Sequence, residues 1–340
     1  RLRSRGLGDV YKRQGFTKKV TDYLLEEYAR LGYSAKRTVK GGVIAEIGGE
    51  GDPILTMAHV DTLGAVVAEI KSNGRLRLSP VGGFNANNAE AHNCRVYTYD
   101  GQIYEGTIQL ADASLHVNKE YSTTQRTFQS VEVVLDEPVT SKDDVKALGI
   151  TNGCFVCADP NLVVTNSGYI KSRFLDDKLS AAILLGYAKY IRENNITPLR
   201  KVYQHMTVFE EVGHGACASI PEDVTELLSV DMGCVGDGLE CTERQVSICA
   251  KDGHGPYNYQ VTTGLVNAAK KDSIDYAVDI YPFYGSDADA ALSAGKDARH
   301  GLIGAGVYAS HGYERSHKDG VVNTFRLLCS YLNGNAPKMD

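Results

Sequence analysis

Hydrophobic and polar positions in this chain recur with two periods, one typical of helices and one typical of strands. Helical spacing begins near Phe16 and stops at Gly32. The apolar residues that share one face of this predicted helix are Val20, Tyr23, Leu24, Tyr28 and Leu31. Residues 37–39 and 43–47, joined by a Gly-Gly turn, predict a hairpin, and residues 53–58 predict a short apolar strand. This opening is typical of an α/β domain.

The pattern changes between residues 66 and 164. Short alternating segments follow one another here, Gly, Asn and Asp separate them, and no long amphipathic helix interrupts. The predicted strands cover residues 75–78, 94–99, 102–108, 129–135 and 155–158. We therefore predict a small β-barrel-like domain, residues 66–164, inserted into the α/β domain.

The α/β pattern resumes at residue 165 and continues to about residue 335. The predicted helices cover residues 177–194, 257–271 and 319–332, and the strand-like segments cover residues 201–208, 227–231, 246–250, 274–281 and 304–310. Residues 284–289 predict a loop. Residues 15–65 and 165–335 are thus expected to form one α/β domain. Residues 1–14 carry five basic side chains without apolar periodicity, which predicts a non-native or disordered head.

The composition excludes several classes of protein. A hydrophobic share of 43% and a charged share of 23% are those of a globular chain, and no apolar run approaches the roughly 18 residues of a membrane-spanning helix. A net charge of -6 gives no overall attraction for nucleic acid. Eight cysteines without a recognisable signal peptide predict reduced thiols and a cytoplasmic protein. Small substrates fit this profile best.

Ligand-type side chains stand where five of the predicted segments end, and functional groups collect at such ends in open α/β sheets. They are His59, Asp61, Asp176, Asp177, Glu210, Glu211, Asp231 and His311. Each has a structural explanation by itself; Asp176, for example, would be a good helix N-cap. Together they suit a pair of divalent zinc, cobalt or manganese ions. Asp176 is the candidate bridge, because a carboxylate offers two oxygens.

Two pairs within this set have a predicted division of labour. Asp61 follows His59 by two positions, so in an extended segment its carboxylate can orient the imidazole. Glu210 and Glu211 are neighbours at the end of a strand. If the strand includes them, they point to opposite sides and must serve different roles.

The order of the motifs, His-x-Asp, Asp-Asp, Glu-Glu, Asp and His with a β insertion between the first two, resembles the M42 family of dinuclear metallo-aminopeptidases. This family includes the glutamyl and tetrahedral aminopeptidases. The resemblance spans roughly residues 16–332 and implies a three-layer, mixed-sheet metallopeptidase domain. It also implies removal of N-terminal residues from short peptides, two divalent metal ions (Zn²⁺, Co²⁺ or Mn²⁺) per subunit, and a homo-oligomer such as a dodecamer.

The resemblance assigns roles to individual metal ligands. Asp176 would bridge the two ions. His59 and Asp231 would hold one ion, and Glu211 and His311 would hold the other.

The resemblance also implies roles around the metals. Glu210 would be the general base, and Asp61 would support His59. The peptide bond between Asp176 and Asp177 would be cis, as in similar enzymes.

Three points stay open at this level. Family members commonly have Glu where Thr62 follows the His-x-Asp motif, so a contact to the substrate amine there is not assured. His317 is an alternative to His311 as the last metal ligand. We prefer His311 because it directly follows a strand-like segment. The preferred N-terminal residue is not determined, although residues 286–288 and 301–306 are expected to border the specificity pocket.

Two other functions compete with the peptidase interpretation. Glu210 and Glu211 are paired carboxylates, as in a glycoside hydrolase of the glucanase type. Glycosidase carboxyls, however, flank the scissile bond at about 5–9.5 Å, which suits sequence neighbours on a strand poorly. The chain also contains no tryptophan, a common platform for sugars. The second alternative is a metal-free homologue that binds peptides or acts in assembly.

Overall fold

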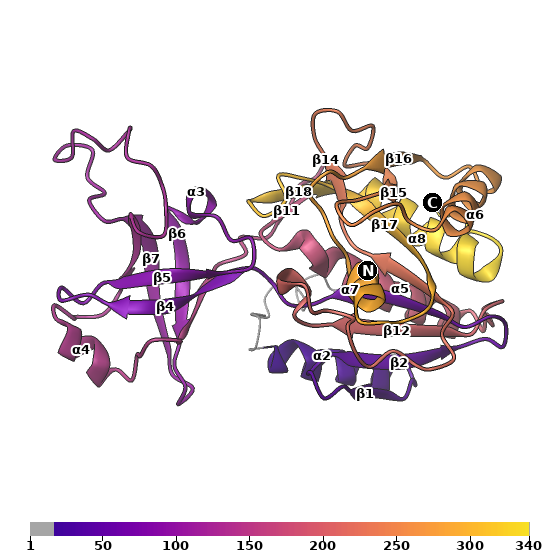
Figure 1. Cartoon of the computed structure of the whole chain (residues 1–340), viewed down its shortest axis with the longest axis horizontal. Helices are drawn as coiled ribbons and strands as arrows, with labels where there is room; N and C mark the ends of the chain where they lie inside the picture. Colours follow the sequence, from indigo (N-terminus) through magenta and orange to yellow (C-terminus); the bar gives the residue numbers. More distant parts are fainter. Residues whose placement is uncertain (1–16, 340) are drawn as a thin grey trace. The chain divides into compact units, whose positions relative to one another are not determined.

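The computed structural model describes residues 17–339, and the chain divides into two compact units. One unit combines the residues up to Thr62 with those from Leu162 onward, and the other runs from Leu63 to Asn161 (Figure 1). The predicted head, residues 1–14, lies outside the described residues.

Within the described residues, twelve strands of the first unit form one mixed sheet. They are β1 (Ala35–Arg37), β2 (Val43–Gly48), β3 (Ile54–His59), β10 (Val163–Val164), β11 (Tyr169–Ser172), β12 (Val202–Thr207), β13 (Glu226–Val230), β14 (Gly233–Val235), β15 (Val246–Lys251), β16 (Tyr276–Ile280), β17 (Arg299–Tyr308) and β18 (Glu314–His317). The main path runs β1-β2-β12-β3-β13-β17-β18-β11-β10. At its centre β12, β3, β13 and β17 are parallel neighbours. These four strands therefore present their carboxyl ends at one edge of the sheet.

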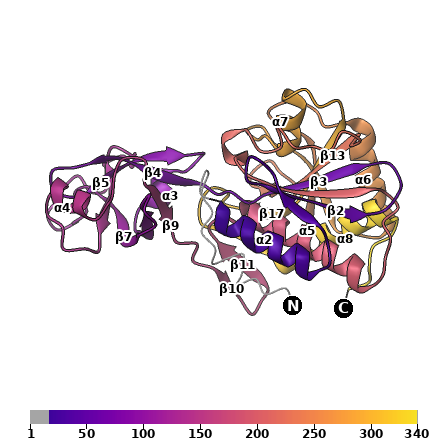
Figure 2. The same ribbon diagram turned by 90° about the horizontal axis from the view of Figure 1, so that it is seen from below.

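Helices cover both faces of this sheet and make three layers. They are α2 (Lys18–Arg30), α5 (Leu175–Glu193), α6 (Tyr259–Lys271), α7 (Asp287–Ser293) and α8 (Lys318–Asn333). Figure 2 shows α2, α5 and α8 on one side of the strands and α7 on the other. The first face has a continuous apolar core that includes Leu24 of α2, Leu184 of α5 and Leu327 of α8. On the opposite face, Ala288 and Ala291 of α7 belong to a separate core cluster.

The second unit is a closed barrel. Its strands are β4 (Gly64–Ile70), β5 (Leu76–Val81), β6 (His92–Tyr97), β7 (Ile103–Leu110), β8 (Val131–Leu135) and β9 (Phe155–Ala158), and its short helices are α3 (Ala86–Ala89) and α4 (Lys142–Ala147). The strands close in the order β4-β5-β8-β7-β6-β9. Alternate residues of β7, namely Gly106, Ile108 and Leu110, are buried, as expected for strands around a packed interior. The predicted α/β class with a β-barrel insertion is confirmed.

Several elements of the first unit differ from the sequence prediction. The loop predicted for residues 284–289 is wrong in its second half, because α7 begins at Asp287, where Ser286 and Asp289 form a capping box. The strands β10, β11, β14 and β18 were not predicted; each is short, and pairing with neighbouring strands defines it. No helix of the described chain is long and apolar enough to cross a membrane.

Candidate metal centre

The parallel strands bring most of the predicted ligands to one edge of the sheet. His59 is the last residue of β3, and Asp231 directly follows β13. Glu210 and the ligand Glu211 come shortly after β12, and His311 follows β17 by three residues. Because parallel neighbours end at the same edge, residues far apart in sequence meet there. The remaining ligand, Asp176, comes from the start of α5.

Glu210 and Glu211 do not continue the strand before them. β12 ends at Thr207, Phe209 takes a left-handed conformation (φ 68°), and Glu210–Val212 form one 3-10 turn. The Asp61 carboxylate accepts hydrogen bonds from the backbone N–H groups of Glu210 and Glu211, both at 3.2 Å. Both glutamates consequently line the same cavity, and the opposite orientations expected for strand neighbours do not apply.

The Asp176 carboxylate lies between two histidines. Its Oδ1 is 2.8 Å from Nε2 of His59, and its Oδ2 is 3.5 Å from Nε2 of His311. Glu314 holds the two segments together, because it accepts hydrogen bonds from the backbone N–H of Asp176 (3.1 Å) and from that of His311 (3.0 Å). His311 Nε2 is also 3.7 Å from a carboxylate oxygen of Glu211. One carboxylate thus faces two ligand groups at once.

The start of α5 has unusual backbone geometry at the acidic pair. Asp176 and Asp177 have non-helical dihedrals, and the peptide bond between them is cis, as the family resemblance implies. No side-chain cap hydrogen bond is present at this helix start, so Asp176 is not a cap. Asp177 instead accepts a hydrogen bond from the backbone N–H of His59 at 3.2 Å.

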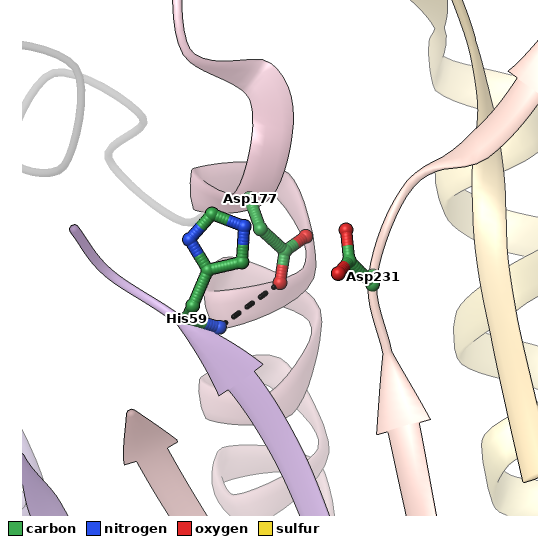
Figure 3. A group of neighbouring side chains, drawn as sticks. All are labelled: His59, Asp177 and Asp231. Carbon is green, nitrogen blue, oxygen red and sulfur yellow. Dashed lines mark hydrogen bonds between the residues drawn. The ribbon is translucent and has the colours of Figure 1, made fainter. Parts of the chain in front are cut away.

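Asp177 also lies near two proposed ligands. Figure 3 shows the Asp177 carboxylate beside His59 and turned toward that of Asp231. One ligand atom from each of these three residues lies within 4.8 Å of the others. Asp177 is fully buried, and its Oδ1 has no hydrogen-bond partner among the described residues.

His317 occupies a different environment from His311. Its Nε2 lies 2.8 Å from the Ser167 carbonyl oxygen, and its Nδ1 accepts a hydrogen bond from the Asp319 backbone at the start of α8. It is 1% exposed and caps that helix. Of the two histidines, only His311 lies against the acidic cluster in the structure described.

The buried acids change one another's affinity for protons. Burial raises the pKa of Asp231 to about 7, and the charge of Asp176 adds to this effect. Burial likewise raises the pKa values of Glu210 and Glu211 well above those of an ordinary glutamate. Against the effect of burial, hydrogen bonds from the two histidines hold the pKa of Asp176 below its usual value. The hydrogen bond to Asp176 in turn raises the pKa of His311 to about 9.

These residues fit divalent metal ions. Glu211 Oε1, like Asp177 Oδ1, is buried without a hydrogen-bond partner in the part of the chain described, and such an atom costs about 1–3 kcal/mol. A second group of ligand atoms within 4.8 Å comprises His59, Asp176 and Glu211. Crowded carboxylates that raise one another's pKa are stabilised by a cation, and imidazole with carboxylate is a donor set that suits zinc, cobalt or manganese.

A cavity of about 500 Å³ opens onto this cluster. Asp176, Glu210, Glu211, Asp231 and His311 form part of its wall. The remaining lining residues are Gly213, Gly215, Cys217, His254, Phe283, Tyr284, Gly285, Ser286, Asp289, Ala290, Ser293 and Ala294. Of residues 286–288, Ser286 borders the cavity as expected, whereas Asp287 and Ala288 are buried and are not part of the lining described. Residues 301–306 lie within β17 and do not contribute to that lining either.

A family model described as M42 glutamyl aminopeptidase matches residues 41–327. The chain belongs to this family. The resemblance drawn from the order of the motifs is thereby confirmed, and membership supports an aminopeptidase. The M42 chain is 44% identical over 320 residues to "Putative aminopeptidase YhfE" of Bacillus subtilis, covering 94% of this chain and 92% of that relative.

Solved structures share the fold of this M42 chain. Aminopeptidase APDkam598 from the archaeon Desulfurococcus kamchatkensis has a TM-score of 0.84 at 22% identity, covering 97% of this chain and 93% of that one. The Pyrococcus horikoshii TET1 peptidase has a TM-score of 0.83 at 22% identity, covering 95% and 96%. Its description states that it can assemble into a tetrahedron or a large octahedral shell.

Sequence reasoning missed three contacts in this site. His59 Nδ1 lies 3.1 Å from the backbone carbonyl oxygen of Asp61 and 3.7 Å from its carboxylate, so the carboxylate does not hydrogen-bond the ring as predicted. The two hydrogen bonds that this carboxylate accepts from the turn at Glu210 were not foreseen. Glu314 was not among the predicted site residues, although it joins two ligand segments. Asp177 was not predicted to be a metal ligand, and its closeness to Asp231 has no signal in the sequence beyond the adjacent pair of acids.

Proposed function

We propose that this chain is a dinuclear metal-dependent aminopeptidase that removes N-terminal residues from short peptides. The observation that carries the proposal is the Asp176 carboxylate, which presents one oxygen to His59 and the other to His311 within a buried acidic cluster. His59, Asp176 and Asp231 would hold one ion. Asp176, Glu211 and His311 would hold the other.

The chain's own residues supply proton transfer and positioning. Metal ions held at this cluster would polarise the scissile carbonyl and lower the pKa of a bound water. Glu210 lines the cavity and does not itself need to be a ligand, and burial raises its pKa well above that of an ordinary glutamate. It can therefore take a proton from the attacking water and pass it to the leaving amine. The Asp61 carboxylate holds Glu210 in place by accepting a hydrogen bond from the Glu210 backbone N–H.

Cleavage at the N-terminus would follow from contacts of the free α-amino group at this end of the cavity. That group can bind a metal ion or meet a carboxylate that the metals do not hold, whereas an acylated backbone nitrogen can do neither. Either contact would place the first peptide bond at the metals. It would restrict the enzyme to exopeptidase action.

The test uses a panel of aminoacyl p-nitroanilides with protein that has been chelated and then reconstituted with zinc, cobalt or manganese. We expect chelation to abolish hydrolysis and metal to restore it. Glu210→Gln should keep its metals while kcat falls by at least about 100-fold. Glu222→Gln, which changes an exposed glutamate of the same unit, is the matched control and should leave kcat unchanged.

Three outcomes would contradict the proposal. Full activity of Glu210→Gln would remove the assigned base. Absence of any bound or activating metal would favour the metal-free peptide-binding homologue. Hydrolysis of β-glucans without hydrolysis of aminoacyl substrates would favour a glycoside hydrolase.

We propose in addition that the chain is a homo-oligomer. Support comes from the shared fold with the TET1 peptidase, for which tetrahedral and octahedral assemblies are described. Light scattering coupled to size-exclusion chromatography tests this: a dodecamer predicts twelve times the chain mass of 36.9 kDa. A monomer at micromolar concentration would contradict it.

A further inference from the structure

The cavity wall away from the acidic cluster is built largely of small side chains. On this wall, Gly285, Ala290, Ser293 and Ala294 leave room beside the first turns of α7, and Phe283 and Tyr284 add aromatic surface. A cavity of about 500 Å³ easily holds the side chain of one amino acid. The space therefore accepts a long N-terminal side chain with an apolar stem.

One acid, Asp289, stands at this wall outside the set of proposed metal ligands. It is 8% exposed and lines the cavity, and its Oδ2 accepts hydrogen bonds from the Ser286 backbone N–H at 2.9 Å and from the Ser286 hydroxyl at 3.0 Å. Its Oδ1 lies 4.0 Å from Nε2 of His300, and Asp252 and His254 each place one side-chain atom within 4.8 Å of an Asp289 oxygen. Oδ2 is thus engaged by the start of α7, whereas Oδ1 accepts no hydrogen bond from the described residues.

A second buried acid lies behind the first. Asp252 is fully buried, and the Tyr257 hydroxyl lies between the two carboxylates, at 2.7 Å from Asp252 and 3.3 Å from Asp289. Burial and the contact with Asp252 raise the pKa of Asp289 to about 6, so Asp289 is ionised at neutral and alkaline pH. In the part of the chain described, neither acid has a lysine or arginine within ion-pair distance.

The basic side chains beside this pair are His254, His300 and Lys251, whose amine donates a hydrogen bond to the Asp252 backbone carbonyl oxygen at 2.7 Å and which is not part of the cavity lining described. His254 lines the cavity, and one of its ring nitrogens lies within 4.8 Å of an oxygen of each acid. No lysine or arginine contributes to the described lining. The far wall is therefore negative, with a charge that the proposed metals do not neutralise. A cationic side chain gains from that charge, and an acidic one is repelled by it.

We infer that the cavity selects peptides whose N-terminal residue is lysine or arginine, and that Asp289 is the residue that determines this specificity. The inference rests on the proposed aminopeptidase function and names its substrate class. The stem of the basic side chain lies along Phe283, Tyr284 and Ala290, and its charged end meets Oδ1 of Asp289.

The experiment compares kcat/KM for lysyl, arginyl, leucyl and glutamyl p-nitroanilides on the full chain with its activating metal at pH 8. We expect lysyl and arginyl substrates to exceed leucyl by at least tenfold and glutamyl by at least a hundredfold. Asp289→Asn should lower the lysyl-to-leucyl ratio at least tenfold. A purely structural role in the capping box would lower both rates together and leave the ratio unchanged.

The chain offers a matched control for the capping role. Ser141 and Asp144 form the same type of capping box in the barrel unit, so Asp144→Asn removes an equivalent helix cap away from the cavity and should leave the ratio unchanged. If the unaltered chain prefers leucyl or glutamyl substrates, this inference is overturned and the proposed aminopeptidase function stands. That result does not depend on the folding of any variant. An unchanged ratio in Asp289→Asn also overturns the inference. Failure to hydrolyse any of the four substrates overturns the proposed function and this inference with it.

Discussion

Asp61→Asn isolates the contact that places the proposed general base. The change keeps the shape of the side chain but replaces one carboxylate oxygen with an amide nitrogen, which cannot accept a hydrogen bond. One of the two backbone N–H groups, that of Glu210 or that of Glu211, then loses its partner. The charge that strengthens the remaining hydrogen bond is lost as well.

The magnitude follows from the hydrogen bond that is lost. A hydrogen bond to a charged group contributes about 1.5–3 kcal/mol, and about 1.4 kcal/mol corresponds to a tenfold change in rate. If the whole loss is expressed in the transition state, kcat falls by about 10- to 150-fold. The assay is steady-state hydrolysis of the best aminoacyl p-nitroanilide at saturating metal, with urea unfolding measured in parallel.

Asp279 provides a control of the same chemistry. Its two carboxylate oxygens accept hydrogen bonds from the backbone N–H groups of Glu240 (2.8 Å) and Cys241 (3.0 Å), and it does not line the cavity. Asp279→Asn should therefore lower the free energy of unfolding by a similar amount and leave kcat unchanged. The reasoning fails if Asp61→Asn keeps kcat within twofold of the unaltered chain, or if both variants lose activity equally.

Further predictions concern the metals, the two histidines and pH. Asp176→Asn should weaken both metal sites and Asp231→Asn mainly one, as counted by metal analysis after dialysis; equal losses would contradict the bridge. His311→Ala should reduce bound metal, whereas His317→Ala should lower the melting temperature and keep the metal; the reverse result would exchange their roles. Burial, with the charge of Lys40 nearby, lowers the pKa of His205 to about 4. Protonation of His205 therefore favours the unfolded chain as pH falls from about 6.5 toward 4, and the free energy of unfolding decreases by about 2 kcal/mol at pH 5. In urea unfolding, the free energy of unfolding of His205→Gln should decrease between pH 7.5 and pH 5 by about 2 kcal/mol less than that of the unaltered chain. The same decrease in both proteins would refute the lowered pKa of His205.

Local patterns were sufficient for much of the architecture. Apolar residues at helical spacing predict α2, and alternation bounded by turn residues predicts the inserted barrel, because both depend on residues a few positions apart. The acids and histidines at the ends of predicted strands could be collected into one candidate site for a similar reason. Parallel neighbouring strands end at the same edge of a sheet, wherever they lie in the sequence.

The sequence by itself therefore determined the fold class, the family and the residue types at the candidate metal centre. Only the tertiary structure decided which atoms meet, such as His59 and Asp176, which are 117 positions apart. It also decided that the carboxylates of Asp61 and Glu314 accept hydrogen bonds from backbone N–H groups of the site segments. The packing of α7 likewise places Asp289 at the cavity wall. Periodicity reports which face of an element is buried, whereas contacts of this kind depend on turn conformations and on the packing of distant elements, for which no local pattern exists.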